Sequence, residues 1–419
     1  MNELETRREK LFSLMKENSV AIFFAGVSKI ASEDEYLPFC INKNFYYLCE
    51  IEQENSALML VKGVGERKVY LFIDEYSELK EKWTGKRLTP EQAKLISSVE
   101  NIYTNNNFES MVSLALAKEN NQYGEIDTLY LDLSPELKIK EEFSTRQYRN
   151  EIEEKYPHIK VENGYAFLEQ MRMIKSPYEL EKMMKAINAT NNGIQALIKN
   201  LKPGQYEYEL ADMFEFYGRV HNRSRLAFGT IVAAGKNATC LHYPTQTSMV
   251  KADDLVLFDL GYSYGNYSAD ISRTYPVSGK FEGVQRDIYT AVLNTNKAVI
   301  EYIREGMTLK ELNDFTANFL TKECIRLGLM EKNDDIRKYY YHSVSHHLGL
   351  DTHDIGARDI HLMNGNVITV EPGLYFDKFG VGVRIEDDVV IMNGRAEVLS
   401  KDIKKEIADI ERMFAFRNQ

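Results

Sequence analysis

The sequence has few cysteines and no apolar run long enough to cross a membrane. Its four cysteines (Cys40, Cys49, Cys240 and Cys324) lie far apart without CxxC spacing, which fits reduced thiols better than a disulfide framework or a thiolate metal site. The longest apolar runs, such as Val20 to Val27, fall far short of the roughly 20 residues that a spanning helix needs. The opening residues, MNELETRREKLF, are too charged to form a signal peptide. These absences predict a cytoplasmic protein without a membrane segment.

An excess of positive charge is also absent. The chain carries 52 Lys and Arg against 63 Asp and Glu, a formal net charge of -11. Binding to a polyanion depends on Lys and Arg side chains that displace counterions from phosphates. We therefore expect no nucleic-acid partner.

The length of 419 residues predicts two domains, because one hydrophobic core rarely organises so long a chain. Residues 1–165 alternate strand-like runs with helix-compatible stretches, which is typical of a compact α/β domain. Residues 166–419 interleave long helical patterns with β-rich segments and indicate an α+β domain with a curved antiparallel sheet. The strand-like runs are Val20 to Phe24, Ala57 to Val61, Val69 to Ile73 and Leu129 to Leu133, followed in the second domain by Leu255 to Gly261, Val367 to Gly373 and Val381 to Ile391.

A long amphipathic helix is predicted near the start of the second domain. Ser176 can serve as the N-cap, Pro177 suits the first helical position, and Glu179 completes a capping box. Apolar residues then recur at helical spacing until Pro203 and Gly204 end the pattern.

Histidine is scarce but clustered. Of eight histidines, five (His342, His346, His347, His353 and His361) fall within twenty positions. A lone histidine is more often structural than catalytic, but five in one segment favour a metal-ligand or proton-transfer role for some of them. The residues alone do not say which.

Three apolar, strand-like runs of the second domain each contain an acid: Asp259 in LVLFDLG, Glu371 in VITVEPG and Glu386 in VGVRIEDDVVI. Asp270 joins them, because the GYSYGNY segment that separates it from Asp259 contains two glycines and can form a β-hairpin. Burial of an ionised carboxylate without a partner costs several kcal/mol. Each acid therefore needs a compensating charge.

An internal salt-bridge network with Arg273 and Arg384 is one way to compensate these acids, but it would leave a net charge of about -2 in a site of low dielectric constant. Two divalent cations would balance four carboxylates fully, and one imidazole could complete the coordination. Oxygen-rich sets with a single histidine favour Mn, Fe or Co over a closed zinc site. Two such ions can hold a hydroxide between them at neutral pH, which predicts a hydrolase.

The same segments resemble a known family. LVLFDLGYSYGNYSADISRTY, SHHLGLDTHD, TVEPGLYF and GVRIEDDVVI resemble the Xaa-Pro aminopeptidases (aminopeptidase P) of the pita-bread metallopeptidase superfamily. The similarity covers nearly the whole chain and includes NFYYLCEI, WTGKRL, MRMIKSPYELEKM and TIVAAGKNATCLHY. It implies an N-terminal creatinase/prolidase-like α/β domain and a C-terminal pita-bread (creatinase/aminopeptidase-like) α+β catalytic domain.

The resemblance also implies a set of metal ligands. Asp270 and Glu386 would bridge two divalent ions, Asp259 would chelate one of them, and His346 with Glu371 would hold the other. Manganese is the expected metal, and cobalt, iron and zinc are the alternatives.

Further residues match the substrate side of the family's active site. Glu371 would accept the proton of the attacking water. His242 and His353 would steady the scissile carbonyl and relay protons, and His342 matches another pocket histidine. Arg384 matches the arginine beside the bridging glutamate. His347 directly follows a ligand on a probable strand, so its side chain should point to the opposite face. The histidines without a family role are His158, His221 and His361.

The implied reaction is hydrolysis of the bond between an N-terminal residue and a following proline in oligopeptides, with a hydroxide that bridges two metal ions as the nucleophile. A prolidase that cuts only Xaa-Pro dipeptides is the first alternative, and a non-catalytic, peptide-binding member of the fold is the second. Methionine aminopeptidase is disfavoured because about 160 N-terminal residues would have no role. The resemblance also points to a homodimer or higher homo-oligomer, in which Trp83 either approaches a neighbouring active site or packs within its own domain.

Overall fold

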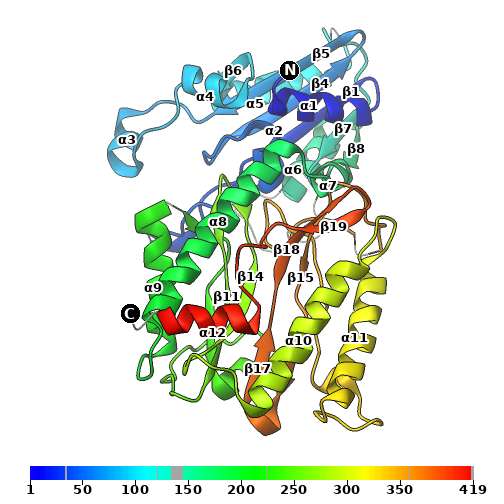
Figure 1. Ribbon diagram of the computed structural model, residues 1–419. Helices are drawn as coiled ribbons and strands as arrows, with labels where there is room; N and C mark the ends of the chain where they lie inside the picture. The colour runs from blue at the N-terminus through cyan, green and yellow to red at the C-terminus, as the bar shows by residue number, and fades with distance from the viewer. Residues whose placement is uncertain (34, 120, 134–144, 223, 358, 417–419) are drawn as a thin grey trace. The chain divides into compact units, whose positions relative to one another are not determined.

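The computed structural model in Figure 1 describes residues 1–33, 35–119, 121–133, 145–222, 224–357 and 359–416. The chain forms two compact units, Met1–Met171 and Arg172–Gln419. The division falls inside α7 (Tyr165–Met173), a few residues after the predicted boundary between residues 165 and 166. No helix in the described ranges is long and apolar enough to cross a membrane.

The N-terminal unit is built on a six-stranded mixed sheet in the order β6-β5-β4-β1-β7-β8. β1 pairs antiparallel with β4 and parallel with β7, and these central strands are almost wholly buried, which explains their predominantly apolar sequences. The strands are β1 (Ser19–Phe24), β4 (Ala57–Gly63), β5 (Glu66–Ile73), β6 (Asn101–Thr104), β7 (Thr128–Leu131) and β8 (Lys160–Asn163), with a small ribbon of β2 (Ile30–Ser32) and β3 (Glu35–Tyr36). The other helices of this unit are α1 (Glu3–Leu14), α2 (Lys43–Cys49), α3 (Glu78–Thr84), α4 (Pro90–Ser97), α5 (Phe108–Leu116) and α6 (Thr145–Lys155).

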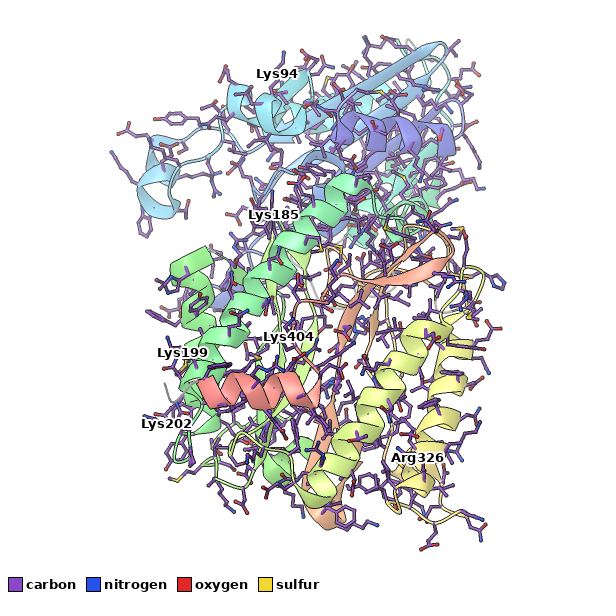
Figure 2. The ribbon with its side chains drawn as sticks, viewed as in Figure 1. Lys94, Lys185, Lys199, Lys202, Arg326 and Lys404 are labelled. Carbon is purple, nitrogen blue, oxygen red and sulfur yellow. The ribbon has the colours of Figure 1, made fainter. Side chains whose placement is uncertain are left out.

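The C-terminal unit opens with the predicted helix, α8 (Pro177–Asn200). The predicted capping box is confirmed: the Glu179 backbone N–H donates to Ser176 Oγ at 3.3 Å, and the Ser176 N–H donates to Glu179 Oε2 at 3.0 Å. Lys185 and Lys199, labelled in Figure 2, lie on the exposed face of α8, and the opposite face joins the core.

The sheets of the C-terminal unit are antiparallel throughout their described pairings, with strand orders β10-β11-β14, β15-β18-β19, β16-β17 and β13-β12-β9. Figure 1 shows α8, α10 and α12 in front of these strands, with α11 beside α10. The helices are α9 (Glu207–Tyr217), α10 (Gly283–Tyr302), α11 (Leu309–Arg326) and α12 (Ile407–Phe416). The strands are β9 (Arg225–Leu226), β10 (Ile231–Ala234), β11 (Leu255–Leu260), β12 (Tyr262–Tyr264), β13 (Tyr267–Ser268), β14 (Ile271–Pro276), β15 (Val367–Val370), β16 (Gly373–Phe376), β17 (Val381–Arg384), β18 (Asp387–Met392) and β19 (Arg395–Val398).

Side chains along the central strands alternate between a large hydrophobic core and the opposite face of the sheet. On β11, Val256, Phe258 and Leu260 belong to the core that includes helices α8 and α10. Asp259 points the other way, because successive side chains of a strand face opposite sides. The same alternation applies at Glu371 and Glu386. The residues that directly precede them, Val370 and Ile385, belong to that core, so the two acids face the other side.

Two predicted continuous strands are interrupted where their acids lie. The run from Val367 to Gly373 divides into β15 and β16, and the run from Val381 to Ile391 divides into β17 and β18. Both breaks occur because the chain leaves one sheet and enters another: β15 pairs with β18, whereas β16 pairs with β17. Glu371 and Glu386 occupy these crossing points, where the Glu386 N–H donates to the Ser272 carbonyl at 3.0 Å.

The predicted hairpin between Asp259 and Asp270 is confirmed. The register that pairs Asp259 with Ser272 continues to the pairing of Tyr264 with Tyr267, around a turn at Gly265 and Asn266. Both turn residues have positive φ, 54° and 62°, as a type I′ turn requires. Asp270 is therefore two positions from the residue opposite Asp259, on the same face of the hairpin.

We expect Gly261→Ala to destabilise this hairpin. A Cβ atom at position 261 would lie 1.9 Å from the Ala269 carbonyl oxygen, so the two strands would have to separate. The expected cost is about 1–3 kcal/mol of unfolding free energy. Gly229→Ala is the matched control, because a Cβ there meets no atom within 4 Å. Chemical denaturation of both variants tests the expectation, and equal stabilities would contradict it.

Candidate metal centre and active site

One cavity of about 380 Å³ in the C-terminal unit brings together all nine residues that the sequence singled out as ligands or catalytic groups. Its wall also includes three apolar residues, Phe228, Ile231 and Leu241. The nine residues are His242, Asp259, Asp270, His342, His346, His353, Glu371, Arg384 and Glu386.

His346 is surrounded by the acids. Its Nε2 lies 3.4 Å from Asp270 Oδ2, 3.7 Å from Glu371 Oε1 and 4.0 Å from Glu386 Oε1. Its Nδ1 lies 2.9 Å from the His347 carbonyl oxygen, which can only accept, so Nδ1 carries the proton. A neutral His346 then has the Nε2 lone pair directed at the acids, as a metal ligand requires.

Among the described residues, Asp270, His346 and Glu386 form a group whose possible ligand atoms all lie within 4.8 Å of one another. Asp259 and Glu371 complete an oxygen-rich set with one imidazole, which suits hard or borderline divalent cations. The donor atoms of these residues therefore fit the metal ions that the sequence predicts.

Arg384 compensates only part of this negative charge. Its Nη2 donates to Asp259 Oδ2 at 2.6 Å, and its Nε donates to Ser272 Oγ at 2.7 Å. Ser272 in turn donates to Glu386 Oε2 at 2.8 Å. Arg273, the second arginine considered as a partner, instead pairs with Asp387 at 2.7 Å. The internal salt-bridge network therefore has one arginine in the site rather than two.

Burial and mutual repulsion disfavour ionisation of the acids in the absence of metal. Burial raises the pKa of Glu371 to about 7, although His346 and Arg384 oppose the rise. Burial and the charge of Asp270 raise the pKa of Glu386 well above its ordinary value. The pKa of Asp259 is also raised by burial, against the attraction of Arg384. These groups would be fully ionised only with additional positive charge beside them.

The pKa values of His346 and Arg384 are also raised, which for these basic groups favours the charged form. Burial alone would lower the pKa of His346, but its hydrogen bond to Asp270 and the charges of Asp270 and Glu371 raise that pKa to about 9. Burial would likewise lower the pKa of Arg384, but Tyr375 and Asp259 hold it well above the ordinary value. The site without metal therefore attracts positive charge.

The other cavity histidines differ in their surroundings. His342 Nε2 lies 2.8 Å from the Tyr375 hydroxyl, and burial together with Arg384 lowers the pKa of His342 to about 3, so its ring is neutral. His353 stacks on His346 with ring centroids 4.1 Å apart. His242 and His353 are both exposed at the cavity wall, where a peptide could reach them.

The remaining histidines lie outside the residues that line this cavity. His347 is buried, and its pKa is lowered to about 4 by burial and by Lys175. His158 and His361 contact the backbone carbonyls of Leu116 and Gly306. His221 packs against Tyr217 with ring centroids 4.4 Å apart.

Sequence reasoning missed two polar residues that connect the site. Ser272 links Arg384 to Glu386, and the Tyr375 hydroxyl contacts both His342 and Arg384, the latter at 3.1 Å. The period of two along a strand places Ser272 on the face of Asp270, but the partners of Ser272 and Tyr375 depend on contacts between distant segments.

The metal-free protein should lose stability as the pH rises from 6.5 to 9. Glu371, Glu386 and Asp259 have raised pKa values in the folded state, so the stability they contribute is present below the unfolded value and is lost as the pH rises. The pKa of His346 is raised from 6.5 to about 9, so the stability that His346 contributes is also lost as the pH rises through this range. The lowered pKa of His342 opposes this trend only below pH 6.5.

Thermal unfolding of chelator-treated protein at the two pH values tests this expectation. The Tm should be lower at pH 9, and an excess of Mn²⁺ should remove the difference because the cations balance the ionised carboxylates. A Tm at pH 9 that equals or exceeds the value at pH 6.5 without metal would contradict the account.

Comparison with known proteins agrees with this geometry. Residues 181–393 match metallopeptidase family M24, and residues 4–123 match the aminopeptidase P N-terminal domain. The chain is 33% identical to the Xaa-Pro aminopeptidase of Haemophilus influenzae, over 99% of this chain and 97% of that protein.

Solved structures show the same architecture over both units. Aminopeptidase P from Bacillus anthracis has a TM-score of 0.94 and 37% identity, covering 99% of this chain and 98% of its own. Aminopeptidase P from E. coli with the inhibitor Pro-Leu has a TM-score of 0.89 and 27% identity, covering 99% and 98%. The predicted fold class, an α/β domain followed by a pita-bread domain, is confirmed. The chain belongs to metallopeptidase family M24, among the Xaa-Pro aminopeptidases, and is a metal-dependent exopeptidase.

Proposed function

We propose that this enzyme hydrolyses the peptide bond between an N-terminal residue and a following proline in oligopeptides, and that it uses two divalent metal ions. The observation that carries the proposal is the set of four carboxylates in one cavity with a single arginine among them. Two divalent cations balance such a set, and the similar proteins include ones named Xaa-Pro aminopeptidase and aminopeptidase P.

In this proposal the metal ligands are those that the family resemblance predicts. Asp259, Asp270, His346, Glu371 and Glu386 would hold the two ions. The short distances from His346 Nε2 to Asp270 and Glu371 support the grouping. When bound, the two ions supply Lewis acidity and a hydroxide nucleophile at neutral pH.

The other cavity residues would manage protons and the substrate. Glu371 would accept the proton of the attacking water, as the family resemblance implies. His242 and His353, exposed at the cavity wall, hold the scissile carbonyl and deliver a proton to the proline nitrogen. Arg384 favours the ionised form of Asp259 and holds its carboxylate in place through a hydrogen bond of 2.6 Å.

Both ring nitrogens of His342 already have partners, because Nδ1 lies 2.8 Å from the Ser343 carbonyl oxygen and Nε2 lies 2.8 Å from the Tyr375 hydroxyl. This arrangement fits a neutral pocket histidine rather than a charged one. His342 Nδ1 lies 3.7 Å from Glu371 Oε2. The lowered pKa of His342, due first to burial and then to Arg384, supports this assignment.

Manganese as the metal, a cytoplasmic location and a homodimer or higher oligomer belong to the same proposal. Trp83 is 77% exposed on α3, which buries none of its residues. That exposure favours the interpretation in which Trp83 approaches a neighbouring subunit over packing within its own domain.

Cleavage of Arg-Pro-Pro and Arg-Pro by chelator-stripped enzyme, with and without added Mn²⁺, tests the substrate class. We expect release of arginine from the tripeptide only when Mn²⁺ is present. Cleavage of the dipeptide alone would identify a prolidase, which the aminopeptidase relatives do not favour. If a protein that holds two metal ions cleaves neither peptide, the result would contradict the proposed reaction and favour a peptide-binding role.

Asp270→Asn and His353→Ala should separate metal binding from proton transfer. Asp270→Asn should lose metal and more than about 100-fold of activity, because even the outer partners of metal ligands are worth 10- to 100-fold. His353→Ala should retain both ions and lose about 10²- to 10⁴-fold in kcat, the range for general acid–base catalysis.

Asp253→Asn, a change at an exposed acid before β11, is the control for Asp270→Asn and should keep both metal and activity. Metal content by plasma mass spectrometry and kcat are measured on the same preparations. Wild-type rates in both Asp270→Asn and His353→Ala would show that the residue assignments are wrong.

A further inference from the structure

A buried ionic cluster lies behind the histidine segment. Arg172 Nη2 donates to Asp354 Oδ1 at 2.5 Å and to Asp351 Oδ2 at 2.8 Å, and Lys175 Nζ donates to Asp354 Oδ2 at 2.9 Å. Arg172, Lys175 and Asp354 are 2%, 4% and 9% exposed, so Asp354 holds two desolvated cations at once. Burial alone would raise the pKa of Asp354, but Arg172 and Lys175 lower it to about 2.

Such a cluster needs an explanation other than stability. The desolvation of buried ions costs several kcal/mol each, and buried salt bridges are often no more stabilising than well-packed apolar residues. Their directional hydrogen bonds do fix geometry, because removal of one partner leaves a buried charge unpaired.

The geometry that this cluster fixes is that of the loop preceding Asp354. The Asp354 N–H donates to the His347 carbonyl at 2.9 Å, and the Gly349 N–H donates to the Asp351 carbonyl at 3.0 Å. The loop packs so closely on the cluster that a Cβ on Gly349 would lie 2.2 Å from Asp354 Oδ2 and 2.9 Å from Lys175 Cε.

His353 is the residue whose position depends on these contacts. It directly precedes Asp354, lines the cavity and stacks on His346. Its side chain is exposed, and its backbone continues directly into Asp354, which the buried cluster holds. A shift of about 1 Å in a catalytic group can cost 10²-fold in rate.

We propose that Arg172 and Lys175 are positioning residues that act through Asp354 to hold His353 in the active site. The inference rests on the proposed catalytic role of His353. It extends the active site to the MRMIKSP segment before α8, because Arg172 and Lys175 lie 179 or more positions from their partners in the sequence.

A double-mutant cycle of Lys175→Met and His353→Ala tests the inference. Lys175→Met should lower kcat by about 10- to 100-fold, with little change in KM and with metal content unchanged. The double variant should be no slower than His353→Ala alone, because Lys175 would have no catalytic histidine left to position.

Two further variants distinguish a positioning role of Lys175 from a general loss of protein stability. Lys175→Met with Asp354→Asn removes one charge of each sign and should fold even if Lys175→Met alone does not, and it should show the same loss in kcat. Lys62→Met is the matched control: Lys62 is also buried, donates to the Phe12 and Met15 carbonyls and pairs with Glu17, but belongs to the N-terminal unit. It should lower the Tm without a comparable change in kcat.

The outcomes are distinguishable. Wild-type kcat in Lys175→Met, or losses that multiply in the double variant, would overturn the positioning role while leaving the proposed function intact. A loss of kcat in Lys62→Met as large as in Lys175→Met would also overturn it. Wild-type kcat in His353→Ala would overturn the proposed role of His353 and the inference together.

Discussion

The repulsion among four carboxylates that line one cavity is the constraint on which the rest of the catalytic unit depends. Asp259, Asp270, Glu371 and Glu386 share one cavity, where burial raises the pKa of three of them and a single arginine opposes the charge. A fold holds such groups together only if its backbone is rigid and if cations compensate them. The two-sided sheet supplies the first condition, and divalent metal ions would supply the second.

The antiparallel strands hold the backbone rigid around the acids, because their side chains alternate between the core and the cavity. Each acid follows or lies within a strand whose other face is anchored in the core against α8 and α10. Glu371 and Glu386 lie where strands pass from one sheet to another, so their backbones are tied to neighbouring segments rather than to a regular ladder. Outside the ligand set, the buried pairs of Arg273 with Asp387 and of Arg172 with Asp354 brace the same segments.

Much of this arrangement could be predicted because its signals are local. Acids in apolar strands, the glycine-containing hairpin after Asp259 and the capping box at Ser176 are all visible within short windows of sequence. The strand breaks at Glu371 and Glu386 could not be predicted, because they depend on which strands pair. The links through Ser272 and Tyr375, and the pairing of Arg172 with Asp354 182 positions away, likewise depend on contacts between distant segments.

Anomalous diffraction from crystals soaked in Mn²⁺ tests the central claim most directly, because it locates the compensating charge. The account predicts two anomalous peaks in the cavity, with Asp270 and Glu386 contacting both and His346 contacting one. A cavity without anomalous peaks, at Mn²⁺ concentrations that support activity, would show that the protein compensates its four carboxylates by itself and would contradict the account.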